Sequence, residues 1–186
     1  MTITELAAKW RTDKSPEVQH GYAPYYDEIL GQKEVKRLLE IGIGFQETMP
    51  HVPDYISGAS LFMWEEFFPE AEIFAADIRG DLLINRGNIR SMLCDQSSRE
   101  TMEAVGTEFG GNFDVIIDDG SHQPDHQILT ARALVPFLAP KGIYICEDVE
   151  GYDFVMRSLT NFHPELKIFD LDRTCNDRLV VIRRTW

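Results

Sequence analysis

Residues 37–44, RLLEIGIG, have the pattern of a buried β-strand that ends in a glycine turn. Leucine and isoleucine occupy most of the strand positions, and near-continuous apolar strands are typical of parallel sheets covered on both faces. Gly42 and Gly44 follow where the backbone can turn tightly and approach a ligand closely. The stretch therefore predicts the first strand of a parallel α/β sheet, with a ligand-binding turn at its end.

Similar apolar runs recur along the chain, with helix-like segments between most of them. The expected strands cover residues 37–43, 71–78, 88–95, 113–120, 142–149, 166–171 and 178–184. The expected helices cover residues 60–68, 98–109, 125–138 and 152–161, with Pro136 weakening the end of the third. Alternating strands and helices predict parallel pairing with right-handed crossovers, whereas the last two runs are close enough to pair antiparallel. We therefore expect one Rossmann-like α/β domain over residues 35–186, with a mostly parallel seven-stranded sheet, behind an N-terminal arm over residues 1–34.

The chain is strongly acidic, because 31 Asp and Glu residues oppose 18 Lys and Arg residues and give a net charge of −13. This charge repels phosphate backbones and anionic lipids, so nucleic-acid and membrane-surface binding are disfavoured. The 186 residues, 44% of them hydrophobic, suffice for one domain with a large core. The sequence has no signal-like N-terminus, no membrane-length apolar segment and no CxxC motif, and we expect a reduced, cytoplasmic protein. The choice between a monomer and a homo-oligomer stays open.

Polar side chains follow the first three expected strands, where open α/β sheets bind their ligands. Glu40 can receive an amino or hydroxyl group, Asp77 can accept both hydroxyls of a ribose, and Asp95 or Gln96 can read an adenine edge. The alternative interpretation is a tight turn and ordinary helix caps. The dinucleotide motif GxGxxG fails because Glu47 occupies its third glycine position, where a carboxylate is unfavourable beside a pyrophosphate. A cationic, phosphate-free adenosine ligand fits better, and S-adenosylmethionine meets that description.

A second acidic cluster follows the fourth and fifth strands. Residues 118–122 read DDGSH, and Glu147 and Asp148 end the fifth strand. If these strands are neighbours, the carboxylates converge beside His122, and a hard cation such as Mg²⁺, Mn²⁺ or Ca²⁺ removes their mutual repulsion. Glu147 and Asp148 can share an ion only where the strand has ended or is distorted. The alternative is an ordinary turn and a solvated strand end. His122 has the chemistry of a general base, whereas His126 is expected to have a structural role.

These motifs together resemble the class I S-adenosylmethionine-dependent methyltransferases. More narrowly, the chain is similar to the metal-dependent sugar O-methyltransferases of antibiotic pathways, the mycinamicin and novobiocin type, which are related to cephalosporin-hydroxylase-like proteins. The resemblance rests on TDK at 12–14, HGY at 20–22, LLEIGIG at 38–44, GASLFMW at 58–64, Asp77, CDQS at 94–97, IDDGSH at 117–122 and Glu147-Asp148. The DDGSH motif with the later Glu-Asp pair is the specific part.

The resemblance implies a role for each matching residue. It implies metal ligation by Asp119, Glu147 and Asp148, with His122 as the general base. The implied contacts to S-adenosylmethionine come from Thr12, Glu40, Gly42, Gly44, Asp77, Asp95, Gln96 and Asp118. The arm would cover the active site, with Thr12, Asp13, Tyr22 and Tyr25 taking part, and Tyr22, Tyr25 and His126 are candidate substrate contacts. The sequence departs from the family at Phe45, where more glycine is common, and in the loop of residues 45–57.

The expected function is Mg²⁺- or Mn²⁺-dependent methyl transfer from S-adenosylmethionine to a hydroxyl of a sugar or sugar-bearing natural product. The expected partner is therefore a small hydroxylated acceptor, and neither a nucleic acid nor a membrane. Two alternatives remain: a catechol-type or other small-molecule methyltransferase, which needs less help from a base, and a non-catalytic S-adenosylmethionine-binding protein. A nicotinamide-binding protein is disfavoured by Glu47.

Overall fold

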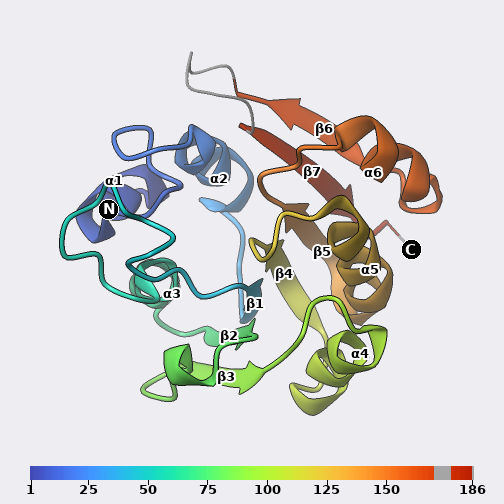
Figure 1. The fold of residues 1–186 in the computed structure, drawn as a ribbon, viewed down its shortest axis with the longest axis horizontal. Coiled ribbons are helices and arrows are strands. Elements are labelled where there is room, and N and C mark those ends of the chain that lie inside the picture. Colours follow the sequence, from blue (N-terminus) through green and yellow to red (C-terminus); the bar gives the residue numbers. More distant parts are fainter. Residues whose placement is uncertain (170–176, 186) are drawn as a thin grey trace.

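A seven-stranded sheet forms the centre of the computed structural model, which describes residues 1–169 and 177–185. The strands are β1 (Arg37–Ile41), β2 (Glu72–Asp77), β3 (Ile89–Leu93), β4 (Phe113–Asp118), β5 (Leu138–Cys146), β6 (Glu165–Ile168) and β7 (Arg178–Arg183). Their order is β3-β2-β1-β4-β5-β7-β6, and β7 runs antiparallel to both β5 and β6 (Figure 1). The predicted mostly parallel sheet with a C-terminal antiparallel pair is confirmed. The last two residues of the strand expected at 166–171 lie outside the described residues.

Helices cover both faces of this sheet. They are α1 (Ile3–Trp10), α2 (Tyr22–Leu30), α3 (Ala59–Phe67), α4 (Arg99–Glu108), α5 (Pro124–Leu134) and α6 (Tyr152–Ser158), with short 3₁₀ turns at Gly80–Leu82, Val135–Phe137 and Thr160–Phe162. Figure 1 shows α1, α2 and α3 on one side and α4, α5 and α6 on the other. Neighbouring strand residues alternate between the two cores, since Leu38 and Ile117 pack with the first group and Leu39 and Ile116 with the second. The sheet is therefore buried on both faces, as its apolar strands predict.

The third expected helix ends earlier than the sequence prediction. Helix α5 ends at Leu134, a 3₁₀ turn follows, and β5 begins at Leu138 instead of residue 142. Pro136 explains the correction because it has no backbone N–H to continue the helix. The free thiols of Cys94 and Cys146 are buried, and Cys175 lies outside the described residues.

The N-terminal arm folds as two helices that the sequence analysis did not predict. Thr2 and Glu5 form a reciprocal capping box at the start of α1, a pattern that is readable in the sequence. Asp27 of α2 accepts hydrogen bonds from the backbone N–H groups of Ile3 and Thr4 at 2.6 and 3.0 Å, which ties the two helices together. Both helices contribute side chains to the core on their face of the sheet. The loop between them is thereby held against the carboxyl ends of the central strands.

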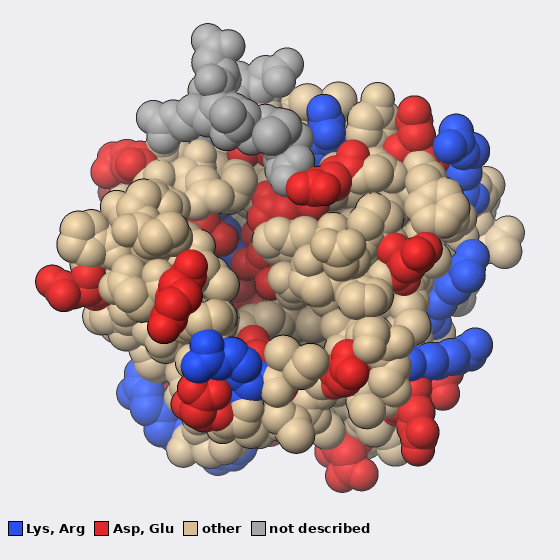
Figure 2. Space-filling view, viewed as in Figure 1, with Lys and Arg blue, Asp and Glu red and all other residues tan. Residues whose placement is uncertain are grey.

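None of the helices within residues 1–169 and 177–185 combines the length and apolar character needed to cross a bilayer. Acidic side chains are spread over the face seen in Figure 2, and some lie at the floor of a hollow between the two groups of helices. That hollow is where the carboxyl ends of the parallel strands meet.

Candidate active site

A cavity of about 430 Å³ lies at the carboxyl ends of β1 to β5. It brings together most of the site residues that the sequence predicts. Those that line it are Gly42, Gly44, Asp77, Asp95, Gln96, Asp119, His122, His126 and Asp148. The others, Thr12, Tyr22, Tyr25, Glu40, Asp118 and Glu147, are buried and lie outside the cavity lining. The arm adds Asp13 and Gln19 to the wall.

The glycine turn after β1 is packed against the turn after β4. Gly42 has a φ of 97°, and a Cβ atom there would lie 2.1 Å from the backbone oxygen of Asp119. The N–H of Asp119 in turn donates to the carbonyl of Ile41 at 2.9 Å. Only glycine fits this close approach, because other residues rarely adopt such a φ and their side chains need the space that the backbone occupies. The glycine turn after β1, which was expected to approach a ligand, is therefore in direct contact with the turn after β4 that carries Asp119.

The carboxylate of Asp77 is fixed at the end of β2. Its Oδ2 accepts from the backbone N–H of Ile43 at 2.6 Å, and its Oδ1 accepts from that of Arg79 at 2.8 Å. Each carboxylate oxygen can accept a further hydrogen bond, and Asp77 lines the cavity. The arrangement suits a ligand with two neighbouring hydroxyls.

Gln96 joins the end of β3 to the end of β4. Its amide nitrogen donates to Asp118 Oδ1 at 2.6 Å and to Thr130 at 3.0 Å, and its oxygen accepts from the N–H of Ser121 at 2.7 Å. Burial raises the pKa of Asp118 to about 7, although hydrogen bonds from Tyr144 and Gln96 oppose the shift. Gln96 and Asp118 thus form a buried polar network that shapes the cavity floor.

Asp119, His122 and Asp148 form a group that could bind a cation. One ligand atom from each lies within 4.8 Å of the others. His122 Nε2 lies 3.3 Å from Asp119 Oδ1 and 3.6 Å from Asp148 Oδ2. The condition set by strand geometry is met for Asp148, because β5 has ended at Cys146 and Asp148 has a left-handed φ of 51°. The carboxylate oxygens of Asp119 and Asp148 are donors of the kind that Mg²⁺ and Mn²⁺ prefer.

The imidazole of His122 is held as a cation by its neighbours. Burial alone would lower the pKa of His122, but the hydrogen bond and charge of Asp119 and the charges of Asp148 and Asp118 raise it to about 9. An ion bound to these carboxylates would compete for the same negative charge. A bound cation would therefore disfavour the proton on His122.

Lys14 lies among the site carboxylates, a position that the sequence analysis did not predict. Its side chain is fully buried, and its Nζ lies 2.6 Å from Asp119 Oδ2, 3.1 Å from Glu147 Oε2 and 3.4 Å from Glu40 Oε1. Burial would lower the pKa of Lys14, but these carboxylates and Asp13 raise it well above its ordinary value. Lys14 was noticed only as part of the TDK motif, because nothing in the sequence near it indicates which carboxylates it meets.

Glu147 is not part of the group that contains Asp148, although it shares the ammonium of Lys14 with Asp119. Its carboxylate accepts from the hydroxyl of Tyr26 and pairs with Lys14. Burial raises the pKa of Glu147 well above its ordinary value even though Lys14 opposes the shift. Metal ligation by Glu147 stays a prediction.

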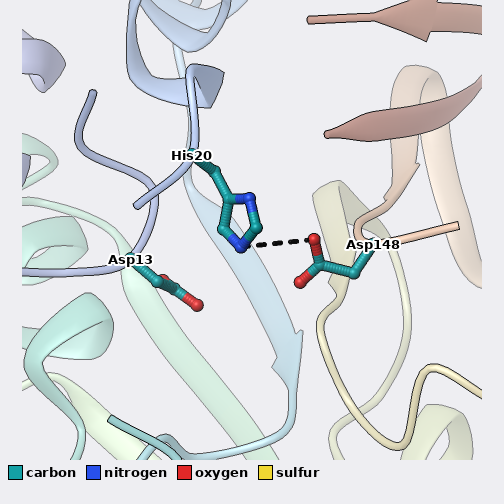
Figure 3. A group of neighbouring side chains, drawn as sticks. All are labelled: Asp13, His20 and Asp148. Atoms are coloured by element: carbon teal, nitrogen blue, oxygen red, sulfur yellow. Dashed lines mark ion pairs between the residues drawn. The ribbon is translucent and has the colours of Figure 1, made fainter. Parts of the chain in front are cut away.

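A second group combines the arm with Asp148. Asp13 and His20 come from the loop between α1 and α2, and their side chains point toward Asp148 (Figure 3). His20 Nε2 lies 3.4 Å from Asp148 Oδ1, and His20 Nδ1 lies 2.5 Å from Asp177 Oδ1. Asp148 therefore belongs to both groups, with one oxygen facing each.

The two tyrosines expected to contact substrate have other surroundings. Tyr22 donates to Asp148 Oδ1 at 2.7 Å and stacks on His20 with ring centroids 4.9 Å apart. The hydroxyl of Tyr25 is buried with no hydrogen-bond partner within the described part of the chain, and its ring packs beside Phe169. Neither side chain lines the cavity. Their role as substrate contacts stays a prediction.

The chain is similar to curated enzymes that methylate sugars of antibiotics. Over 149 residues it is 33% identical to "Mycinamicin VI 2''-O-methyltransferase" of Micromonospora griseorubida, an alignment that covers 79% of this chain and 36% of that protein. It is 36% identical to "L-olivosyl-oleandolide 3-O-methyltransferase" of Streptomyces antibioticus, and that alignment covers 78% of this chain and 36% of that protein. The chain thus spans about a third of the length of these curated relatives. No protein-family model matches the chain.

A solved structure gives the same relationship. The fold matches that of MycE methyltransferase from the mycinamycin biosynthetic pathway, in complex with Mg, SAH and mycinamycin VI, with a TM-score of 0.77 and 25% identity. The match covers 99% of this chain and 53% of that one.

Proposed function

We propose that this chain methylates a sugar hydroxyl. It has the class I S-adenosylmethionine-dependent methyltransferase fold, and it resembles the sugar O-methyltransferases of macrolide and tetracenomycin pathways. The acceptor would be a sugar-bearing small molecule, and the reaction would depend on a divalent ion. The observation that carries the proposal is that the expected donor-binding residues and the possible ion-binding residues line the same cavity. Asp77 and the glycine turn form one part of its wall, and Asp119, His122 and Asp148 form another.

Residues at the ends of β1, β2 and β3 are proposed to hold the methyl donor. Asp77 would accept the two ribose hydroxyls through lone pairs that its backbone partners leave available. Asp95 lines the same cavity at the end of β3, where hydrogen bonds from Ser97 keep the pKa of its carboxyl below its ordinary value. Gly42 lines the cavity, so the ligand would contact the backbone at this turn. No phosphate has to be accommodated among these acids.

Asp119 and Asp148 are proposed to hold the divalent ion, with Glu147 as a further predicted ligand. Bound S-adenosylmethionine supplies an electrophilic methyl group, and a bound divalent ion supplies Lewis acidity that lowers the pKa of a nearby hydroxyl. His122 would accept the hydroxyl proton at Nε2. It can do so only after losing the proton that Asp119 and Asp148 stabilise in the ion-free site. The same two carboxylates would therefore control both ion binding and the state of the base.

The test is formation of S-adenosylhomocysteine and of a methylated product, measured by mass spectrometry with a panel of glycosylated macrolides and tetracenomycins. We expect turnover that EDTA abolishes and Mg²⁺ restores. His122→Ala should lower kcat by about 10²- to 10⁴-fold while calorimetry shows near-normal binding of S-adenosylmethionine. His51→Ala, at an exposed position outside the cavity lining, is the matched control.

Two results would contradict the proposal. Turnover of catechols that survives His122→Ala would indicate a phenol methyltransferase, because a phenol of pKa about 10 needs less help from a base. Binding of S-adenosylmethionine without turnover of any acceptor and without a response to Mg²⁺ would indicate a non-catalytic binding protein.

A further inference from the structure

Each carboxylate of the proposed ion-binding group has one oxygen held by the N-terminal arm. Lys14 Nζ lies 2.6 Å from Asp119 Oδ2, and the hydroxyl of Tyr22 donates to Asp148 Oδ1 at 2.7 Å. The opposite oxygens, Asp119 Oδ1 and Asp148 Oδ2, are the ones that face His122 Nε2. The arm thus contacts one oxygen of each carboxylate, called here the outer oxygen (Asp119 Oδ2 and Asp148 Oδ1). The other oxygen of each, the inner oxygen, faces His122.

Burial makes these two contacts directional. The side chain of Lys14 is fully buried and Tyr22 is 0% exposed, so bulk water does not compete for either donor group. Tyr22 is also fixed from its other side, because its ring stacks on His20. A carboxylate that rotates freely can present either oxygen, whereas one with its outer oxygen bound presents the other. Partners of this kind orient metal ligands and contribute strongly to metal affinity in proteins.

We propose that Lys14 and Tyr22 are positioning residues that fix which oxygens of Asp119 and Asp148 are available to a divalent ion. The proposal rests on the ion dependence of the proposed function. It assigns the arm a part in building the ion site, in addition to the expected part in covering the cavity. It also gives Tyr22 a role other than contact with substrate.

The test uses Mn²⁺ as the probe and the full chain without cofactor or acceptor. Free Mn²⁺ is measured by electron paramagnetic resonance during a titration of wild type, Tyr22→Phe and Tyr25→Phe. Tyr22→Phe removes one hydroxyl and no charge, and we expect Mn²⁺ to bind about 10- to 100-fold more weakly. Tyr25→Phe is the matched control in the same helix, because the Tyr25 hydroxyl has no partner among the described residues. It should leave Mn²⁺ affinity unchanged.

A second pair of variants, Lys14→Arg and its control Lys9→Arg, distinguishes the effect of the ammonium's position from the effect of its charge. This pair does not depend on the folding of Tyr22→Phe. Lys14→Arg keeps a cation beside Asp119 but replaces a compact ammonium by a planar guanidinium. Weaker Mn²⁺ binding is expected, with Lys9→Arg at the exposed pair with Glu66 as the control. A role in charge balance alone would leave the affinity of Lys14→Arg equal to that of wild type.

Affinity for S-adenosylmethionine and the Tm are measured on every variant. Tyr22→Phe that binds Mn²⁺ as tightly as Tyr25→Phe overturns the proposal, and so does a variant that loses Mn²⁺ and S-adenosylmethionine binding to the same degree. The second outcome would mean a general structural role. Wild-type protein that does not bind Mn²⁺ would instead overturn the ion dependence of the proposed function, and this inference with it.

Discussion

The ammonium of Lys14 lies 2.6 Å from Asp119 Oδ2, although 105 residues separate the two in the sequence. Glu147, Glu40 and Asp13 lie within 3.6 Å of the same nitrogen, so one buried cation faces four carboxylates. Removing one partner from a buried ionic cluster leaves uncompensated charge in a low-dielectric interior. Lys14 therefore connects the stability of the fold to the chemistry of the site.

Lys14→Met should destabilise the protein by about 3–5 kcal/mol, because Asp119 loses the buried counter-charge that holds the pKa of its carboxyl below its ordinary value. Urea unfolding in EDTA measures the effect, and Lys9→Met, at an exposed ion pair, should leave the free energy of unfolding near that of wild type. An unfolding free energy unchanged by Lys14→Met would contradict this account of the cluster.

The pKa of His122 should fall when a divalent ion binds. In the ion-free site Asp119 and Asp148 raise it to about 9, so the imidazole is charged at neutral pH. A cation at these carboxylates disfavours the imidazolium and moves the titration to lower pH. Proton–carbon NMR of the imidazole, recorded against pH with EDTA and then with saturating Mg²⁺, follows the shift directly. A midpoint that does not move with Mg²⁺ would place the ion elsewhere.

Asp118→Asn should make stability less dependent on pH. Burial raises the folded-state pKa of Asp118 from 3.8 to about 7. The stability associated with the neutral carboxyl is therefore fully present below about pH 4 and is lost as the pH rises through 7. Denaturant unfolding of wild type between pH 5 and 8 should show this loss, and Asp118→Asn should lack that component. Asp54→Asn, at an exposed position, should follow the wild-type curve. Parallel curves for wild type and Asp118→Asn would refute the prediction.

Gly42→Ala should impair both folding and binding of S-adenosylmethionine. The new Cβ would lie 2.1 Å from the backbone oxygen of Asp119, at a φ of 97° that side chains rarely adopt. We expect a loss of at least about 1–3 kcal/mol in stability, measured by thermal unfolding with calorimetry for the cofactor. Gly80→Ala is the control, because its nearest side-chain atom is 3.8 Å away. Wild-type stability in Gly42→Ala would mean that the two turns are not packed as described.

The sequence predicted the sheet because its strands carry their signal locally. Each strand is an apolar run, and polar residues at the run's end necessarily meet those of neighbouring parallel strands. Asp77, Asp119 and Asp148 could therefore be placed at one cavity without knowledge of any contact. The signal that ends α5 is also local. Pro136 predicts a weak helix end, but the helix ends at Leu134, before the proline, instead of at residue 138.

Orientation and long-range pairing could not be predicted in this way. Lys14 comes from a polar loop, and no periodicity in residues 11–21 indicates that it is buried. The contact of Glu40 with the cofactor stays a prediction, but nothing in the sequence indicated that its Oε2 accepts from the indole N–H of Trp64 at 2.8 Å. Glu147 and Asp148 are adjacent in sequence, yet Glu147 pairs with Lys14 whereas Asp148 accepts from Tyr22. These outcomes depend on how the arm docks, which is a property of the whole fold.

The hydrogen bond from the N–H of Asp119 to the carbonyl of Ile41 joins the turn proposed to hold the methyl donor to a residue proposed to hold the ion. Substitutions that leave Gly42 in place do not remove this bond, because both of its groups belong to the backbone. Loops that recognise the acceptor can therefore diverge in sequence while the spacing of the two reacting partners is inherited with the sheet. For engineering, the loops that recognise the acceptor are the residues to vary, whereas the glycine turn and its backbone contact with Asp119 are to be left untouched.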